Sequence, residues 1–231
     1  MENNRDQYGG INRSTLSPSA RKKVENLIAA VKVSKKIDEH GGWDFGSNFD
    51  YKGRGSALNW DLYAFGNDYH SKRFLIVIQV RQFIRRKKNY FPGIRKSYFL
   101  VGRNEDNSVF AHCVESRIIH NAIKKNQNVL MAVQSWIFNV DYKKVERQGD
   151  IGFIKVKRSK GLQVDKTVVL IKGSHQIESE NIFHDSKNYY VLNPQVTHLM
   201  NVHPALSLIG WYKVAVGQRC FYWDFASPTI D

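Results

Sequence analysis

Cysteine, proline and long apolar runs are all scarce in this chain of 231 residues. Cys113 and Cys220 are the only cysteines, too few for a disulfide framework or an all-cysteine metal site, and they fit a reducing compartment. The longest apolar runs, such as residues 74–78, have the length of a strand, far below the roughly 18 residues of a membrane-spanning helix. The polar first residues lack the apolar core of a secretory signal. We therefore expect a cytoplasmic protein with no membrane partner.

Acidic residues are absent from one long segment. Residues 73–103 contain nine Lys and Arg and no Asp or Glu, so they supply nine of the fourteen net positive charges. The segment is also rich in the β-branched and aromatic residues that favour strands. Charge of one sign carried on strands indicates a fixed surface for a polyanion. The sequence thus predicts nucleic acid as the partner; the alternative is a basic exterior without such a role.

The predicted nucleic-acid surface combines cations with aromatic rings. Strands over residues 73–84 and 97–102 flank a basic loop over residues 85–93. Cations bind phosphates and exposed rings stack on unpaired bases, a combination that favours RNA over DNA. The expected contact residues are Arg81, Arg85, Arg86, Lys87, Lys88, Tyr90, Arg95, Lys96, Tyr98 and Arg103. In the alternative interpretation, Tyr98 belongs to the core and the charges only face solvent.

Hydrophobic periodicity predicts an α+β fold in which a basic N-terminal α+β region packs on a small C-terminal β-barrel or β-sandwich. The expected parts are a flexible arm over residues 1–16, the basic domain over 17–142 and the β-domain over 143–231. In the basic domain we expect a helix over 18–36, loops and short strands over 40–68, and two short helices over 115–139. The strands expected in the β-domain are 151–156, 167–171, 189–192, 206–216 and 220–223.

The β-domain begins with Arg147-Gln148-Gly149-Asp150, followed by Ile151-Gly152-Phe153-Ile154. This opening resembles that of a small β-domain family of prokaryotes and phages, whose members begin Arg-Gln-Gly-Asp-Val. Later features of that family have counterparts in Gly173-Ser174-His175, Thr197-His198, His203-Pro204 and Tyr212-Lys213-Val214, although Gln176 replaces the second histidine of the turn. The resemblance covers about residues 145–216. It implies a β-domain of prokaryotic or phage origin and no particular activity.

Half of the eight histidines lie in this β-domain, at His175, His184, His198 and His203, with Asp150 and Asp185 close in sequence. Neutral imidazoles are common transition-metal ligands, and three of them, or two and a carboxylate, leave a coordination position open for water. Strands could bring His175 and His198 together, so His175, His198 and His203 are the candidate ligands of a divalent transition metal. Since no His-x-His or His-Glu-x-x-His spacing is present, ordinary hydrogen-bonded histidines are the alternative, and the sequence by itself requires no cofactor.

A predicted junction between a strand and a helix provides further candidate catalytic residues: His112, Glu115 and His120. Either histidine would be the general base of a metal-independent RNA cleavage, with Arg117 stabilising the phosphate. The alternative is an ordinary junction with polar capping groups.

These features together predict a nucleic-acid-binding protein with a preference for RNA. The first alternative is an enzyme, a metal-dependent nuclease or phosphodiesterase that uses the histidines of the β-domain. The second is a module that binds an acidic protein partner. The sequence leaves catalysis, substrate and oligomeric state open.

Overall fold

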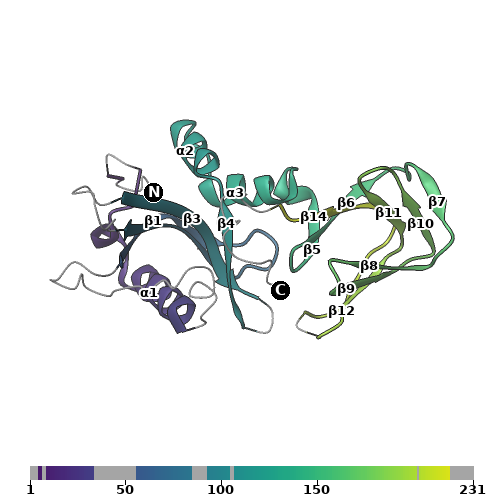
Figure 1. The fold of residues 1–231 in the computed structure, drawn as a ribbon, viewed down its shortest axis with the longest axis horizontal. Coiled ribbons are helices and arrows are strands. Elements are labelled where there is room, and N and C mark those ends of the chain that lie inside the picture. Colours follow the sequence, from purple (N-terminus) through teal and green to yellow (C-terminus); the bar gives the residue numbers. More distant parts are fainter. Residues whose placement is uncertain are drawn as a thin grey trace. The chain divides into compact units, whose positions relative to one another are not determined.

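The computed structural model of the chain describes residues 5–6, 9–33, 56–84, 93–104, 107–201 and 203–218 (Figure 1). These residues contain three α-helices and fourteen strands in three antiparallel sheets, so the fold is α+β. They divide into two compact units, each treated by itself below: residues up to 103 with 109–133, and residues 104–108 with 134–218. No helix among the described residues has the length and apolarity needed to cross a membrane.

The first unit is built on a four-stranded meander with the order β1-β2-β3-β4. Its elements are η1 (Arg13–Thr15), α1 (Pro18–Val33), β1 (Ser56–Asn67), β2 (Phe74–Ile84), β3 (Gly93–Arg103), β4 (Val109–Val114), α2 (Ser116–Lys124) and the start of α3 (Val129–Phe138). The predicted helix after Ser17 is confirmed: the Ser17 hydroxyl accepts a hydrogen bond from the Ala20 amide, and Pro18 occupies the first turn.

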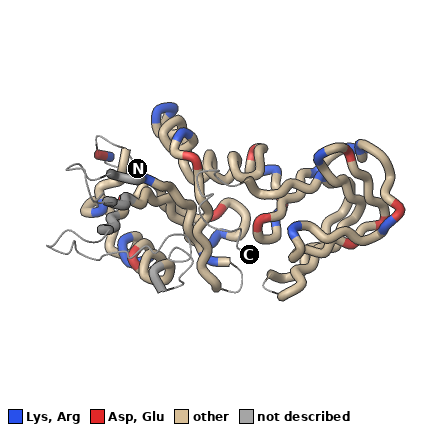
Figure 2. Tube along the Cα trace, in the orientation of Figure 1, with Lys and Arg blue, Asp and Glu red and all other residues tan. Residues whose placement is uncertain are grey.

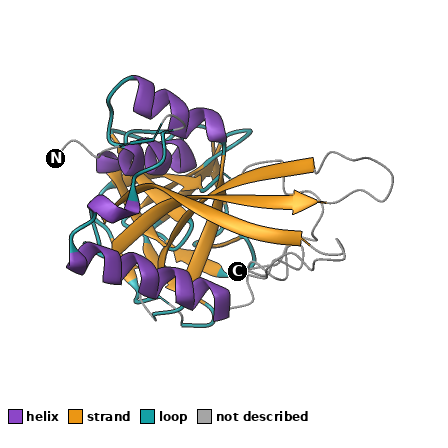
Figure 3. Ribbon diagram, turned by 90° about the vertical axis from the view of Figure 1, so that its left-hand side faces the viewer, coloured by secondary structure: helices purple, strands orange, loops and turns teal. Residues whose placement is uncertain are grey.

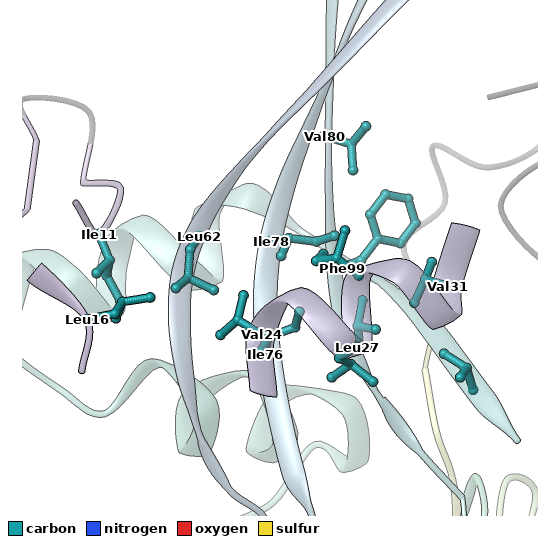
Figure 4. Packing of buried hydrophobic residues seen from close by; sticks show 13 residues of the cluster. Ile11, Leu16, Val24, Leu27, Val31, Leu62, Ile76, Ile78, Val80 and Phe99 are labelled. Carbon is teal, nitrogen blue, oxygen red and sulfur yellow. The ribbon is translucent and has the colours of Figure 1, made fainter. Parts of the chain in front are cut away.

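Helix α1 packs its apolar stripe on one face of this sheet. Val24, Leu27, Ile28 and Val31 are all at most 5% exposed. They form one core with strand residues such as Leu62, Ile78 and Phe99 (Figure 4). Helices lie on both sides of the strands in Figure 3. Successive strand residues point to opposite faces of the sheet, so Tyr98, next to the core residue Phe99, faces the side opposite α1.

Two expectations for the first unit need correction. Ile11 and Leu16 belong to the core, and the Ile11 amide donates to the Leu62 carbonyl, so residues 9–16 are part of the packed unit and not a flexible arm. Residues 56–67, expected as loops and short strands, form the long strand β1, which is irregular between Leu62 and Ala64. Eleven of its twelve residues pair with β2, and this pairing outweighs a local composition rich in asparagine and glycine.

The second unit consists of two antiparallel sheets. One has the order β5-β6-β14-β11-β10-β7 and the other the order β13-β12-β9-β8. Their bounds, after η2 (Tyr142–Lys144), are β5 (Val145–Gln148), β6 (Ile151–Val156), β7 (Leu162–Val164), β8 (Val168–Ile171), β9 (His175–Glu178), β10 (Asn181–His184), β11 (Tyr189–Leu192), β12 (Gln195–His198), β13 (Leu206–Ser207) and β14 (Trp211–Val216).

The two sheets of the second unit enclose one hydrophobic core. Phe153, Ile182 and Val214 come from the larger sheet, whereas Ile177 and Val196 come from the smaller one. Neither sheet closes on itself within the described residues, so the barrel alternative is not found. The strand expected over 206–216 is interrupted at Gly210, which has a φ of +108°, and becomes β13 and β14. The strand expected over 220–223 lies outside the described residues.

Candidate metal centre

Two short strands place the first two candidate ligands side by side. Strands β9 and β12 pair antiparallel, and His175 is the direct cross-strand partner of His198. Side chains directly opposite each other on one sheet face have Cβ atoms roughly 4.5–5.5 Å apart. The ring centroids of His175 and His198 are 4.7 Å apart, and the rings meet edge to face. The expectation that strands bring these two histidines together is confirmed.

The third histidine joins them from the segment that follows β12. The Asn201 amide donates to the His198 carbonyl, and Asn201 has a φ of +52°, so the chain reverses directly after the strand. This turn returns His203 to the other two rings, with centroids 5.3 Å from His198 and 6.0 Å from His175. One nitrogen from each of the three rings lies within 4.8 Å of the others.

These distances suit a metal centre that contracts when it is occupied. Tetrahedral zinc with Zn–N distances of roughly 2.0–2.1 Å separates its nitrogen ligands by about 3.4 Å. The three nitrogens therefore have to move closer by about an ångström, a shift within reach of a side chain on a turn. His175 and His198 are 2% and 4% exposed and His203 is half-buried, so a bound ion would be largely shielded from water.

A glycine provides the space into which two of the rings point. Gly149 is the first residue of the two-residue turn between β5 and β6, with a φ of +58°. A Cβ at this position would lie 2.7 Å from His203 Nε2 and 3.2 Å from His175 Nε2. The Nε2 atoms of both rings therefore converge on a place that only glycine leaves open.

Burial keeps His175 neutral, as a metal ligand must be. Burial lowers the pKa of His175 to about 4; the Asp150 carboxylate opposes this effect, and His198, His203 and Lys172 add to it. His175 Nε2 is buried and has no hydrogen-bond partner. Only one other buried side-chain atom of the described residues shares this state, Gln148 Oε1. An unpartnered buried nitrogen is costly, which makes this atom a candidate metal ligand.

The partners of the remaining ring nitrogens differ between two of the histidines. Ser174 Oγ lies 3.0 Å from His175 Nδ1, which suits a ring that donates from Nδ1 and leaves the Nε2 lone pair to a metal. His198 Nδ1 instead accepts from the Met200 amide at 3.1 Å, so the neutral ring holds its proton on Nε2. Metal binding at His198 must displace that proton or that hydrogen bond. One neutral hydrogen bond contributes about 1 kcal/mol, little beside the roughly 10–16 kcal/mol of structural zinc.

The segment Arg147-Gln148-Gly149-Asp150 supports the centre from one side. The Gln148 amide donates to the carbonyls of Val196 and Pro204, which connects it to β12 and to the segment after His203. The Arg147 guanidinium donates to the Tyr142 hydroxyl and to the Gly149 carbonyl, which fixes the turn. Sequence reasoning missed Gln148, Gly149 and Ser174 as part of the site. A Gly-Asp pair between two strand-like runs was the available signal for the turn.

Other candidates lie elsewhere. His184 is outside the three-histidine cluster; its ring packs on that of Tyr189, with centroids 4.4 Å apart. The Asp185 carboxylate accepts from the Lys187 and Asn188 amides and from the Tyr190 hydroxyl, and the backbone bonds above all hold its pKa down at about 2. Asp185 therefore organises a turn.

The predicted nucleic-acid surface is described only in part. Residues 85–92 lie outside the described residues, as do the side chains of Arg81 and Arg95. The paired backbones of β2 and β3 place Arg81 opposite Lys96 and Gln82 opposite Arg95. Lys96 is exposed and Arg103 is half-buried. Lys and Arg occur along both units (Figure 2).

Tyr98 requires a correction, because it is only 6% exposed and cannot stack on a base. The Gln79 side-chain amide donates to the hydroxyls of Tyr63, at 3.1 Å, and of Tyr98. The Tyr98 hydroxyl is also 3.0 Å from His120 Nε2. Burial, followed by the effect of Tyr98, raises the pKa of Tyr63, so both residues belong to a hydrogen-bonded core.

The three predicted catalytic residues at the strand-to-helix junction make different structural contacts. His120 is an exposed residue of α2 that contacts Tyr98. Glu115 precedes α2 and pairs with Arg117. The half-buried His112 lies on β4, where it is the cross-strand partner of Leu100 on β3. These contacts account for the residues as parts of the junction, while their catalytic role stays a prediction.

No family model matches the sequence, and neither a curated protein nor a solved structure matches the chain. The resemblance of residues 145–216 to the prokaryotic and phage β-domain family stays a prediction.

Proposed function

We propose that this chain is a metal-dependent phosphodiesterase that acts on nucleic acid, with His175, His198 and His203 as the ligands of one transition-metal ion. The observation that carries the proposal is the convergence of three imidazoles around a buried, unpartnered His175 Nε2. Three neutral nitrogens select a borderline metal such as zinc, and they leave a coordination position for the water that attacks phosphorus.

The charge of the chain supports nucleic acid as the substrate. Residues 73–103 hold nine cations and no acidic residue, which suits a polyanion and not a neutral substrate. Recruitment by such a segment needs no base-specific contact, because phosphate neutralisation alone supplies affinity.

Metal analysis of the full chain, expressed without a histidine tag, tests the proposal. We expect one zinc or cobalt ion per chain and cleavage of labelled RNA or DNA that chelation abolishes. Replacement of the half-buried His203 with alanine is expected to weaken metal binding by more than about 100-fold, because even the loss of a residue that only orients a ligand costs 10–100-fold.

His184→Ala is the matched control, since this half-buried histidine lies in the same unit but outside the cluster. It is expected to bind metal as the unaltered chain does. A chain that takes up no zinc, cobalt, manganese, iron or nickel would contradict the proposal, as would equal losses in both variants.

A second candidate function is nucleic-acid binding without cleavage, with RNA preferred. The register of β2 and β3 favours it, because Arg81 lies directly opposite Lys96, and like charges in such a pair destabilise a sheet unless an anion compensates. We expect affinity for single-stranded RNA to fall steeply with salt, and the joint replacement of Arg85, Arg86, Lys87 and Lys88 with alanine to reduce that slope. Binding that is insensitive to salt or to this replacement would exclude the function.

A further inference from the structure

Two charged side chains beside the histidine centre have no part in holding the metal. Asp150 lies in the turn between β5 and β6, and Lys172 lies in the turn between β8 and β9. The Lys172 ammonium pairs with the Asp150 carboxylate. The side chain of Lys172 is 33% exposed and that of Asp150 is 23% exposed, whereas His175 is 2% exposed. The ion pair is therefore more accessible to solvent than the imidazole that the metal would bind.

The pair borders the place where the ligands converge. Asp150 directly follows Gly149, whose missing Cβ would approach the Nε2 atoms of His175 and His203 within 3.2 Å and 2.7 Å. Lys172 begins the three-residue turn that ends at Ser174, next to His175. Both charges are near enough to affect the protonation of His175, Asp150 favouring the charged ring and Lys172 the neutral one.

The conformation of Lys172 is unusual for its residue type. Its φ is +53°, a region in which a non-glycine residue costs roughly 1–2 kcal/mol. The short turn projects the side chain from a fixed backbone, and the bond to Asp150 then orients the ammonium. A lysine ammonium has three donors, so the bond to Asp150 leaves capacity for another oxygen.

We propose that Lys172 binds an anionic oxygen of the ligand at the open metal position, which makes this a site for phosphoryl groups, with Asp150 positioning the ammonium. One phosphoryl oxygen would bind the metal and a second would accept from Lys172, so recognition needs no contact with a base or sugar. This inference rests on the proposed function, because it requires the metal at the three histidines.

The test uses the full chain loaded with cobalt, whose visible absorption reports its ligands. Inorganic phosphate is titrated into the unaltered chain and into Lys172→Met, and cobalt stoichiometry is measured for both. We expect phosphate to change the spectrum of the unaltered chain and to bind Lys172→Met at least tenfold more weakly, with equal cobalt content. Lys172→Arg is expected to restore binding to within about threefold, because it restores the cation.

The matched control is Lys166→Met. This exposed lysine lies just before β8, whereas Lys172 directly follows β8, so the two lysines lie at opposite ends of the same strand. It is expected to bind phosphate like the unaltered chain. Equal phosphate binding by Lys172→Met and the unaltered chain overturns this inference and leaves the metal centre intact. Equal binding of acetate and phosphate overturns the assignment to phosphoryl groups. Absence of cobalt from the unaltered chain overturns the proposed function and this inference together.

Discussion

The first unit buries Tyr63, Gln79 and Tyr98 in a row of hydrogen bonds that ends at the exposed His120. The second unit buries His175 and His198 beside His203, and in this cluster His175 Nε2 has no partner. Both clusters lie on antiparallel sheets and combine aromatic rings with polar atoms. They differ in whether the chain itself provides a hydrogen-bond partner for each of these buried polar atoms.

This difference separates a structural cluster from a ligand site. A buried polar network whose hydrogen bonds are complete rigidifies a core and requires nothing from outside. A buried nitrogen without a partner costs about 1–3 kcal/mol, which is sustained when a ligand recovers more than that on binding. The comparison predicts that substitutions in the first cluster change stability alone, whereas substitutions in the second also change metal binding.

The largest effect is expected from Gly149→Ala. The new Cβ would meet His203 Nε2 at 2.7 Å and His175 Nε2 at 3.2 Å, where the metal is expected to lie. We expect zinc affinity, measured by competition with a chromophoric chelator, to fall by more than about 100-fold, beyond what loss of a supporting residue costs.

Gly173→Ala provides the control for the backbone, because Gly173 has a φ of +70° and a Cβ there would meet nothing within 4 Å. Both substitutions carry the cost of a non-glycine residue at positive φ, about 1–2 kcal/mol. Gly173→Ala should lose this stability and keep its zinc affinity. Equal loss of zinc affinity in the two variants would mean that the turns, and not the space beside Gly149, determine binding.

A smaller effect, on stability alone, is expected from Tyr98→Phe. The substitution keeps the ring but removes the hydroxyl that joins Gln79 to His120, leaving a buried amide donor with one partner fewer. We expect the free energy of unfolding, measured with denaturant, to fall by about 1–3 kcal/mol. Zinc affinity should stay within twofold of the unaltered chain, and a larger change would break the distinction between the two clusters.

A further test within the second cluster is Ser174→Ala. Ser174 Oγ is 3.0 Å from His175 Nδ1 and orients the ring so that Nε2 faces the site. Because such supporting contacts contribute 10–100-fold to metal affinity, we expect about a tenfold loss of zinc binding. Ser179→Ala serves as the control, since this buried serine bonds backbone atoms of Asn181 and Leu192 away from the histidines. Zinc binding as tight in Ser174→Ala as in the control would exclude the orienting role.

Local sequence patterns predicted the elements that local forces determine. Helix α1 has its cap and apolar stripe within one stretch of chain, and the bounds predicted for β6 and β11 match the structure. Among the strands that sequence reasoning missed, β9, β10 and β12 have four residues each and include polar ones. Their pairing with distant strands stabilises them, and a local pattern contains no record of that pairing.

The candidate site shows the same limit. The sequence indicated three histidines, but their meeting depends on the register that pairs His175 with His198 and on the Gln148 contact with the Pro204 carbonyl. Tyr98 was expected on the surface because it lies among the basic residues of the segment 73–103. Tyr98 and Phe99 are consecutive and both buried, so this sheet is covered on both faces and alternation does not distinguish them.

The last expected effect is a pH dependence that belongs to the second cluster. Burial holds the pKa of His175 near 4, below its ordinary value of 6.5. Between these values the unfolded chain binds a proton that the folded chain does not, so metal-free stability is fully present above about pH 6.5 and declines toward pH 4. The decline is at most about 1.4 kcal/mol for each pH unit. We expect Tm to fall over this range more steeply in the unaltered chain than in His175→Gln, which cannot take up the proton. Parallel curves for the two proteins would show that His175 is not held neutral by the fold, and the histidine cluster would then lose the feature that suits it to a metal.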